Sequence, residues 1–185
     1  MPDNGEGGTV LKSLSISRAK GTWTDRVITD AATQVTFTLM SLIQSILFYC
    51  ECHTKLTGYS LSLHRDAKDG AVEAIGSSKC RIDTITVPEN PEVIMKAKFW
   101  SSIASFRFGD REYHWKDRIR SSELRTDSGN IVARFQKRIC SFRKDGELVI
   151  YVDETGLPVD IIIISFIMYL YRRIVAAAGG GHGGH

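Results

Sequence analysis

The chain of 185 residues lacks the features of several common protein classes. Its four cysteines, at positions 50, 52, 80 and 140, do not have the spacing of a zinc ribbon. It has no Asn-x-Ser/Thr sequon, and Met1–Gly8 lacks the basic and apolar parts of an ordinary signal peptide. We therefore expect a cytoplasmic protein with reduced thiols, whose residues 1–8 are disordered.

Catalytic signatures are also missing. The sequence contains no P-loop, dinucleotide-binding fingerprint, His-Glu-x-x-His or Gly-x-Ser-x-Gly motif. His64–Asp66 reads His-Arg-Asp, as in a protein kinase loop, but Ala71 stands where that motif requires Asn. His182 and His185 lie in a Gly-rich stretch, and we expect 176–185 to be a flexible tail without a bound metal. These observations predict a protein that is not an enzyme, with no catalytic residues, cofactor or metal.

What the sequence does contain is a series of short β-type alternations. Hydrophobic residues make up 43% of the chain and charged residues 24%, as in an ordinary globular domain. We expect this domain to span residues 9–175. The alternation recurs at 59–63, 82–87, 106–108, 113–115, 131–135 and 147–152. Many short strands at close spacing indicate an antiparallel sandwich or barrel.

Turn residues and alternation also predict side-chain directions. Asp69–Gly70, Asp127–Asn130 and Lys144–Gly146 have the composition of turns. Residues 131, 133 and 135 are predicted to face inward, and Val132 and Arg134 outward.

The alternation stops at Val159. From there to Tyr171 nearly every residue is apolar, Asp160 suits a helix start, and Arg172 and Arg173 suit the negative end of a helix dipole. A helix at about 159–173 that is apolar on all sides must be buried. Thirteen residues rise about 20 Å, short of the ~30 Å of a bilayer core, so a protein core is the favoured location.

A second apolar stretch, at 35–50, is ambiguous. Val35, Phe37 and Leu39 alternate like a strand, whereas Leu39 to Leu47 has helical spacing. Three interpretations remain open here: a strand running into an amphipathic helix, an interfacial membrane anchor, or a short signal-anchor.

Positive charge is concentrated in one segment. Residues 96–144 contain 13 Lys and Arg and 5 Asp and Glu, a net charge of +8 within a chain of net charge +3. Such a segment can attract phosphates or anionic lipid, or can be a solvated barrel face. Because alternation directs the rings of Tyr113 and Trp115 inward, stacking on nucleic acid is disfavoured. The candidate binding residues, expected to point outward or to lie nearby, are Arg107, Lys116, Arg134, Lys137 and Arg138.

Several short segments resemble a known superfamily. Thr24–Asp30, Tyr113–Lys116, Ile131–Phe135, Gly146–Ile150 and the terminal apolar helix are similar to the fungal branch of the tubby C-terminal-like superfamily. That branch is related to LURP-one-related proteins and phospholipid scramblases. The resemblance covers most of residues 22–174. It implies a closed antiparallel barrel of about twelve strands around the C-terminal helix, a mainly β fold.

The function expected from these features is binding rather than catalysis. Tubby proteins bind phosphoinositides through paired basic residues, but that pair has no counterpart that aligns here. We expect a binding or scaffold module for anionic phospholipid or phosphoinositide, peripheral to a membrane, with no nucleic-acid partner. The alternative is an integral or anchored membrane protein that uses the apolar segments 35–50 and 159–178.

Overall fold

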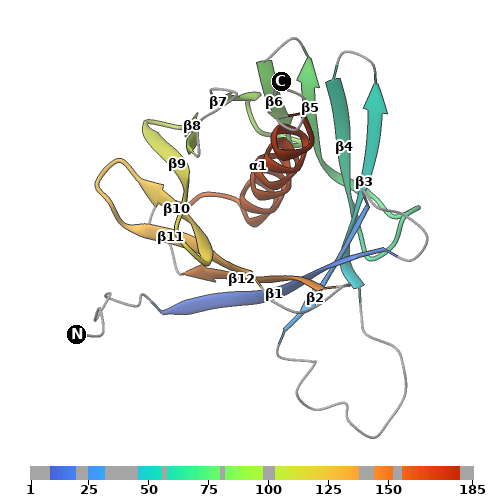
Figure 1. The fold of residues 1–185 in the computed structure, drawn as a ribbon, viewed down its shortest axis with the longest axis horizontal. Helices are drawn as coiled ribbons and strands as arrows, with labels where there is room; N and C mark the ends of the chain where they lie inside the picture. Colours follow the sequence, from blue (N-terminus) through green and yellow to red (C-terminus); the bar gives the residue numbers. More distant parts are fainter. Residues whose placement is uncertain are drawn as a thin grey trace, which may run out of the picture.

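The protein, in a computed structural model, is a closed antiparallel β-barrel with a helix inside it (Figure 1). The structure describes residues 9–19, 25–31, 46–55, 58–79, 82–97, 103–137, 144–151 and 156–179. The strands are β1 (Val10–Arg18), β2 (Arg26–Asp30), β3 (Ile46–Lys55), β4 (Gly58–Arg65), β5 (Val72–Lys79), β6 (Ile82–Thr86), β7 (Val93–Ala97), β8 (Ile103–Phe108), β9 (Arg111–Asp117), β10 (Ser121–Thr126), β11 (Ile131–Lys137) and β12 (Lys144–Tyr151). The helix α1 spans Val159–Gly179.

The order of the strands is the simplest that a barrel allows. Each strand pairs with its neighbours in the chain, and β1 closes the barrel by pairing with β12. Successive connections therefore alternate between the two ends of the barrel. The predicted fold class, a closed antiparallel barrel of about twelve strands around a buried C-terminal helix, is confirmed.

The helix is inside because a barrel of this size needs filling. Eight strands make a barrel that wall side chains alone can fill, and the diameter grows with strand number. Ile161–Tyr169 is buried without interruption, as the all-round apolar pattern predicted. Phe166 packs between Phe135 and Trp115, with ring centroids 4.4 Å and 5.2 Å away. No helix among the described residues has the length and apolar character needed to cross a bilayer.

Trp115 and Ser165 pair their polar groups inside the barrel. Nε1 of the fully buried Trp115 donates a hydrogen bond to Oγ of Ser165 at 3.1 Å, and Ser165 donates in turn to the carbonyl of Ile162 at 3.0 Å. The indole and the hydroxyl thus avoid the cost of burial without a partner. The predicted inward direction of Tyr113 and Trp115 is confirmed, since both have no exposed surface.

Two predictions about the last strands were wrong. Val132 is buried rather than outward, because the β10–β11 register shifts between Leu124 and Arg125 and leaves Val132 as an extra residue on β11. Such a bulge breaks the simple alternation. Lys144–Gly146 is not a turn but the start of β12, where Gly146 pairs with Ile16 of β1. A Cβ at Gly146 would lie 2.5 Å from the ring of Phe135, so packing explains this glycine.

Other segments also differ from expectation. Ile46–Cys50 belongs to β3, because residues 48 to 50 pair with β2 and β4, so this part of the 35–50 stretch is not helical. Residues 35–45 lie outside the described residues, as do 1–8 and 180–185. Ser121–Thr126 forms a strand that the alternation did not predict. The helix continues to Gly179, so residues 176–179 are helical rather than part of a tail.

Candidate functional site at the cationic mouth of the barrel

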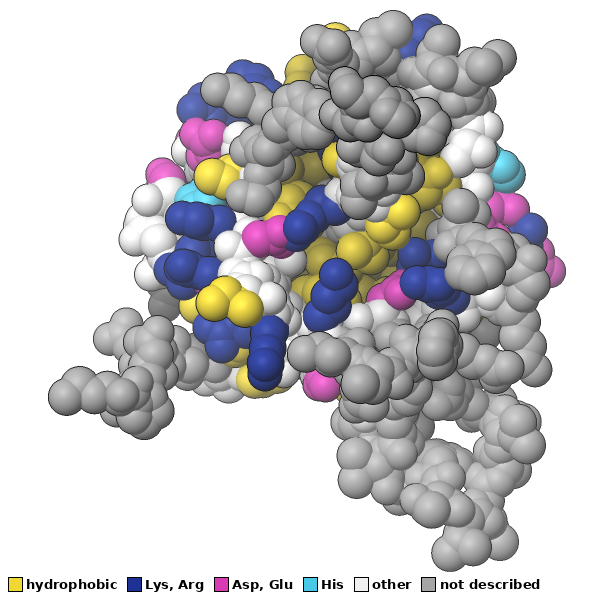
Figure 2. Space-filling view, in the orientation of Figure 1, with side chains coloured by type: hydrophobic (Ala, Val, Ile, Leu, Met, Phe, Trp, Pro, Cys, Tyr) yellow, Lys and Arg dark blue, Asp and Glu magenta, His cyan; other side chains and the backbone are white. Residues whose placement is uncertain are grey.

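The end of the barrel at which the C-terminal half of α1 emerges, here called the mouth, collects positive charge. The Lys and Arg residues on the described strand ends, on the β9–β10 connection and on α1 at this end are Arg18, Arg26, Lys55, Lys79, Lys96, Lys116, Arg118, Arg120, Lys137, Lys144, Arg172 and Arg173. Figure 2 shows this face, where Lys and Arg side chains surround a hollow floored by hydrophobic ones.

Carboxylates at the mouth are fewer, and each has a partner within the protein. Asp25 accepts hydrogen bonds from the hydroxyl of Tyr49 and the backbone nitrogen of Cys52. Asp145 lies 2.5 Å from Nε of Arg26. Asp83 and Asp117 are paired with Arg172 and Arg173 of α1. The acidic groups are thus committed to structural contacts.

The opposite end of the barrel has the reverse charge. Its described carboxylates are Asp30, Asp66, Asp69, Glu73, Glu89, Glu92, Asp110, Glu112, Asp127 and Asp160. They outnumber the Lys and Arg residues there. The small net charge of the whole chain therefore conceals a strong separation of charge along the barrel axis.

A cavity of about 280 Å³ opens within the mouth. It is lined by the β9–β10 connection, the end of β11 and one face of α1, with apolar side chains from Phe135, Phe166 and Leu170. Four cationic residues and one acidic residue line it: Arg118, Arg120, Lys137, Arg173 and Asp117. Its volume is slightly below that of a typical small-ligand pocket.

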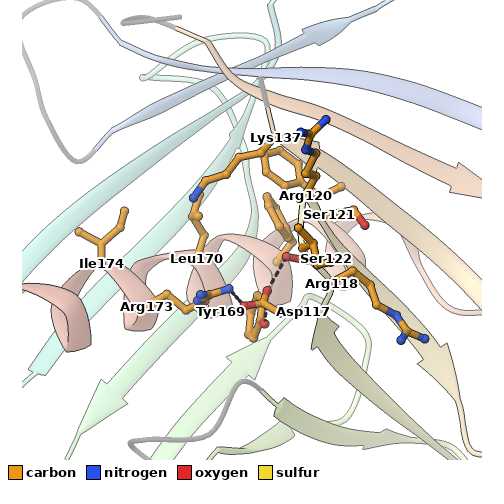
Figure 3. Close-up of a pocket in the computed structure, with 13 residues that line it drawn as sticks. Asp117, Arg118, Arg120, Ser121, Ser122, Lys137, Tyr169, Leu170, Arg173 and Ile174 are labelled. Atoms are coloured by element: carbon orange, nitrogen blue, oxygen red, sulfur yellow. Dashed lines mark hydrogen bonds and ion pairs between the residues drawn. The ribbon is translucent and has the colours of Figure 1, made fainter. Parts of the chain in front are cut away.

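The acidic residue of the cavity is fully engaged. The Asp117 carboxylate accepts hydrogen bonds from Ser122 at 2.8 Å and Tyr169 at 2.7 Å, and Arg173 pairs with its second oxygen (Figure 3). Burial raises the pKa of Tyr169 to about 12, so its hydroxyl stays protonated and donates. Asp117 therefore fixes α1 to the wall, because its carboxylate binds Tyr169 and Arg173 of the helix.

Among the cations that line the cavity, Arg120 and Lys137 have the least internal compensation. Neither forms an ion pair with a carboxylate among the described residues, whereas Arg118 lies 3.4 Å from Glu123. The backbone nitrogen of Lys137 donates to the carbonyl of Arg120 at 3.2 Å, which holds the two residues side by side. In Figure 3 the Lys137 side chain extends from β11 towards the helix. Each of these side chains can bind a phosphate or carboxylate from outside.

The residues that the sequence predicted to bind anionic ligands do not lie together in the structure. Lys137 lines the cavity, and Arg138 lies outside the described residues. Arg107 and Lys116 are exposed and point outward as predicted, but they do not form one site. Lys116 pairs in register with Ile103, and Arg107 is about 13 Å further along β8.

Arg134 also points outward, but its charge is already matched. Its Nη2 lies 3.0 Å from Glu123, which Arg118 and Arg125 also contact. Burial alone would raise the pKa of Glu123, but these three arginines outweigh it and hold that pKa below its usual value. Arg134 is therefore mainly a structural residue of the wall.

Sequence reasoning missed Asp117, Arg118, Arg120 and Arg173 as residues of one site. A signal was present in the run Asp117–Ser121, where an isoleucine lies between two arginines directly after a strand. Arg173 was interpreted as a helix-dipole partner, yet α1 continues six residues beyond it, to Gly179.

The described part of the chain shows no arrangement for metal chemistry. Within it, no three His, Cys, Asp or Glu side chains gather as a metal site would require, and Cys50 and Cys52 are free thiols. Burial raises the pKa of both thiols, which disfavours the reactive thiolate.

Comparisons with protein-family models, with curated proteins and with solved structures found no match to this chain.

Proposed function

We propose that this protein is a non-enzymatic binding module that docks on anionic phospholipid membranes through the mouth of its barrel. The observation that carries the proposal is the separation of charge: cations gather at the mouth, while the described carboxylates there are paired internally. A polybasic surface is attracted to an anionic leaflet by about 1 kcal/mol for each Lys or Arg near it. A cytoplasmic protein peripheral to the membrane fits this role.

The architecture supports the further proposal that the chain is a tubby-like domain. The segments of the chain that resemble that superfamily lie on β2, β9, β11, β12 and α1. A closed twelve-stranded barrel around a C-terminal helix is what the resemblance implies. The ligand proposed by this route, a phosphoinositide or another anionic phospholipid, is compatible with the cationic cavity.

Vesicle sedimentation tests the proposal. We expect the purified protein to sediment with phosphatidylcholine vesicles that contain phosphatidylserine or a phosphoinositide, and not with phosphatidylcholine alone. Binding should weaken strongly between ~0.1 M and ~1 M salt, because the Debye length falls from about 10 Å to about 3 Å. Failure to sediment with anionic vesicles at low salt would contradict the proposal.

A matched pair of charge-reversal variants locates the surface. Arg120→Glu with Lys137→Glu at the mouth should weaken binding by about 30-fold or more, given about 1 kcal/mol for each cation lost. The control, Arg107→Glu with Arg111→Glu, makes the same charge change near the opposite end and should retain most of the binding. Equal losses of binding in both variants would mean that the membrane contacts the side wall, or that binding follows the net charge, and would contradict docking through the mouth.

A further inference from the structure

The tip of the β9–β10 connection exposes an isoleucine completely. Ile119 has a relative exposure of 101%, the highest among the large hydrophobic side chains that the structure describes. Exposed isoleucines elsewhere, such as Ile75 at 44% and Ile94 at 52%, retain partial contact with the barrel wall. A single exposed apolar residue is common at a protein surface, so only its surroundings can distinguish Ile119.

The setting of Ile119 is cationic and braced by the backbone. Arg118 and Arg120 flank it in the sequence. The backbone nitrogen of Arg118 donates to the carbonyl of Ser121 at 2.7 Å, and that of Lys137 donates to the carbonyl of Arg120 at 3.2 Å. The tip is thus held at both sides of the isoleucine, which leaves that side chain directed into solvent.

More apolar surface is exposed at the same mouth. Ile174 and Val175, on the emerging part of α1, are 46% and 44% exposed, and Ile174 lines the cavity together with Ile119. Apolar groups surrounded by Lys and Arg suit the boundary between lipid headgroups and acyl chains. There the apolar groups leave water, while long cationic side chains extend back to the phosphates.

We propose that Ile119 inserts into the headgroup–acyl boundary of an anionic phospholipid bilayer and anchors the barrel mouth-first, with Arg118 and Arg120 on the lipid phosphates. This inference rests on the proposed function and deepens it, because it assigns an insertion residue and an orientation. The charge of the mouth selects the bilayer as the occupant. Ile119 adds a contribution that does not depend on charge and therefore resists salt.

Substitutions at Ile119 test the anchor, with an isoleucine on the side wall as control. We expect Ile119→Ser to bind phosphatidylserine vesicles about tenfold more weakly than wild type, Ile119→Leu to bind within about twofold, and Ile94→Ser to be unchanged. Unchanged binding of Ile119→Ser would overturn the proposal. Because Ile119 is completely exposed, both Ile119 variants should keep the wild-type thermal unfolding midpoint.

Fluorescence quenching tests the insertion itself. The fluorescence that Ile119→Trp adds to that of wild type should be quenched by phospholipids brominated on their acyl chains. The fluorescence that Ile94→Trp adds should not be quenched. An Ile119→Trp protein that binds the vesicles without this quenching would overturn the insertion while leaving the proposed function intact. Wild-type protein that does not bind anionic vesicles would instead overturn the proposed function, and the anchor with it.

Discussion

Gly76 lies on the inner face of β5, directly against α1. A Cβ built there would lie 2.6 Å from Sδ of Met168 and 3.3 Å from Cγ1 of Ile164. Cβ atoms do not approach other atoms at the first of these distances without displacement. The absence of a side chain on this strand therefore sets how closely the helix can approach the wall.

Adding one methyl group at this position should destabilise the protein. We expect Gly76→Ala to lower the free energy of unfolding by about 1–3 kcal/mol, the usual cost of overpacking a core. Urea denaturation measures this, and Met168→Ala combined with Gly76→Ala provides the control. Since the double variant removes the clash, its loss should be smaller than the sum of the two single losses. Simple additivity would show that the helix does not press on Gly76.

At the scale of elements, α1 is fixed to the wall by two arginines that point to different strands. Arg173 pairs with Asp117 at the end of β9, and Nη1 of Arg172 lies 3.1 Å from Asp83 at the start of β6. Asp83 has no exposed surface. Burial raises the pKa of Asp83, and the opposing effects of Ser78 and Arg172 do not cancel that rise.

A raised carboxyl pKa gives stability a definite pH dependence. In the unfolded chain Asp83 ionises near its ordinary pKa of about 3.9, whereas in the folded protein ionisation requires a higher pH. Its contribution is therefore fully present below the unfolded pKa and is lost as pH rises through the folded one. Asp83→Asn, which stays neutral, should gain stability relative to wild type with rising pH, by at most about 1.4 kcal/mol per pH unit.

Urea denaturation of both proteins between about pH 4 and pH 7.5 measures the difference. Ser77→Ala, an uncharged change on the neighbouring strand, should show no such trend. If Asp83→Asn instead loses stability relative to wild type as pH rises, the attraction of Arg172 outweighs the burial of the carboxylate.

At the scale of the whole molecule, the arrangement of charge matters more than its total. The net charge of +3 is small, yet the two ends of the barrel differ in sign. A surface of negative charge should therefore meet the mouth in preference to the acidic end.

Cation-exchange chromatography tests this polarity without lipid. Arg120→Gln with Lys137→Gln lowers the net charge by two at the mouth and should elute at clearly lower salt than wild type. Glu92→Gln with Asp110→Asn raises the net charge by two at the acidic end and should shift elution much less. Shifts of equal size in opposite directions would mean that the resin senses net charge alone.

The sequence by itself determined the repeating elements of this protein. Alternating apolar residues specify strands, because side chains of a strand face opposite sides of a sheet, and Tyr113 and Trp115 were placed correctly on that basis. The apolar run from Val159 to Tyr171 favoured a buried helix, since it is apolar on every side and its thirteen residues are shorter than a bilayer core requires. These properties are local, so they could be predicted from neighbouring residues.

The tertiary structure alone decided the register and the site. The bulge at Val132 depends on the register with the neighbouring strand β10. Gly146 pairs with Ile16, which lies more than a hundred residues away in the chain. Alternation along one strand reports neither. Likewise, Arg134 forms an ion pair with Glu123, whereas a backbone hydrogen bond brings Lys137 next to Arg120 at the mouth. Closure of the barrel brings alternate connections to one end, and only that geometry turns scattered cations into one surface.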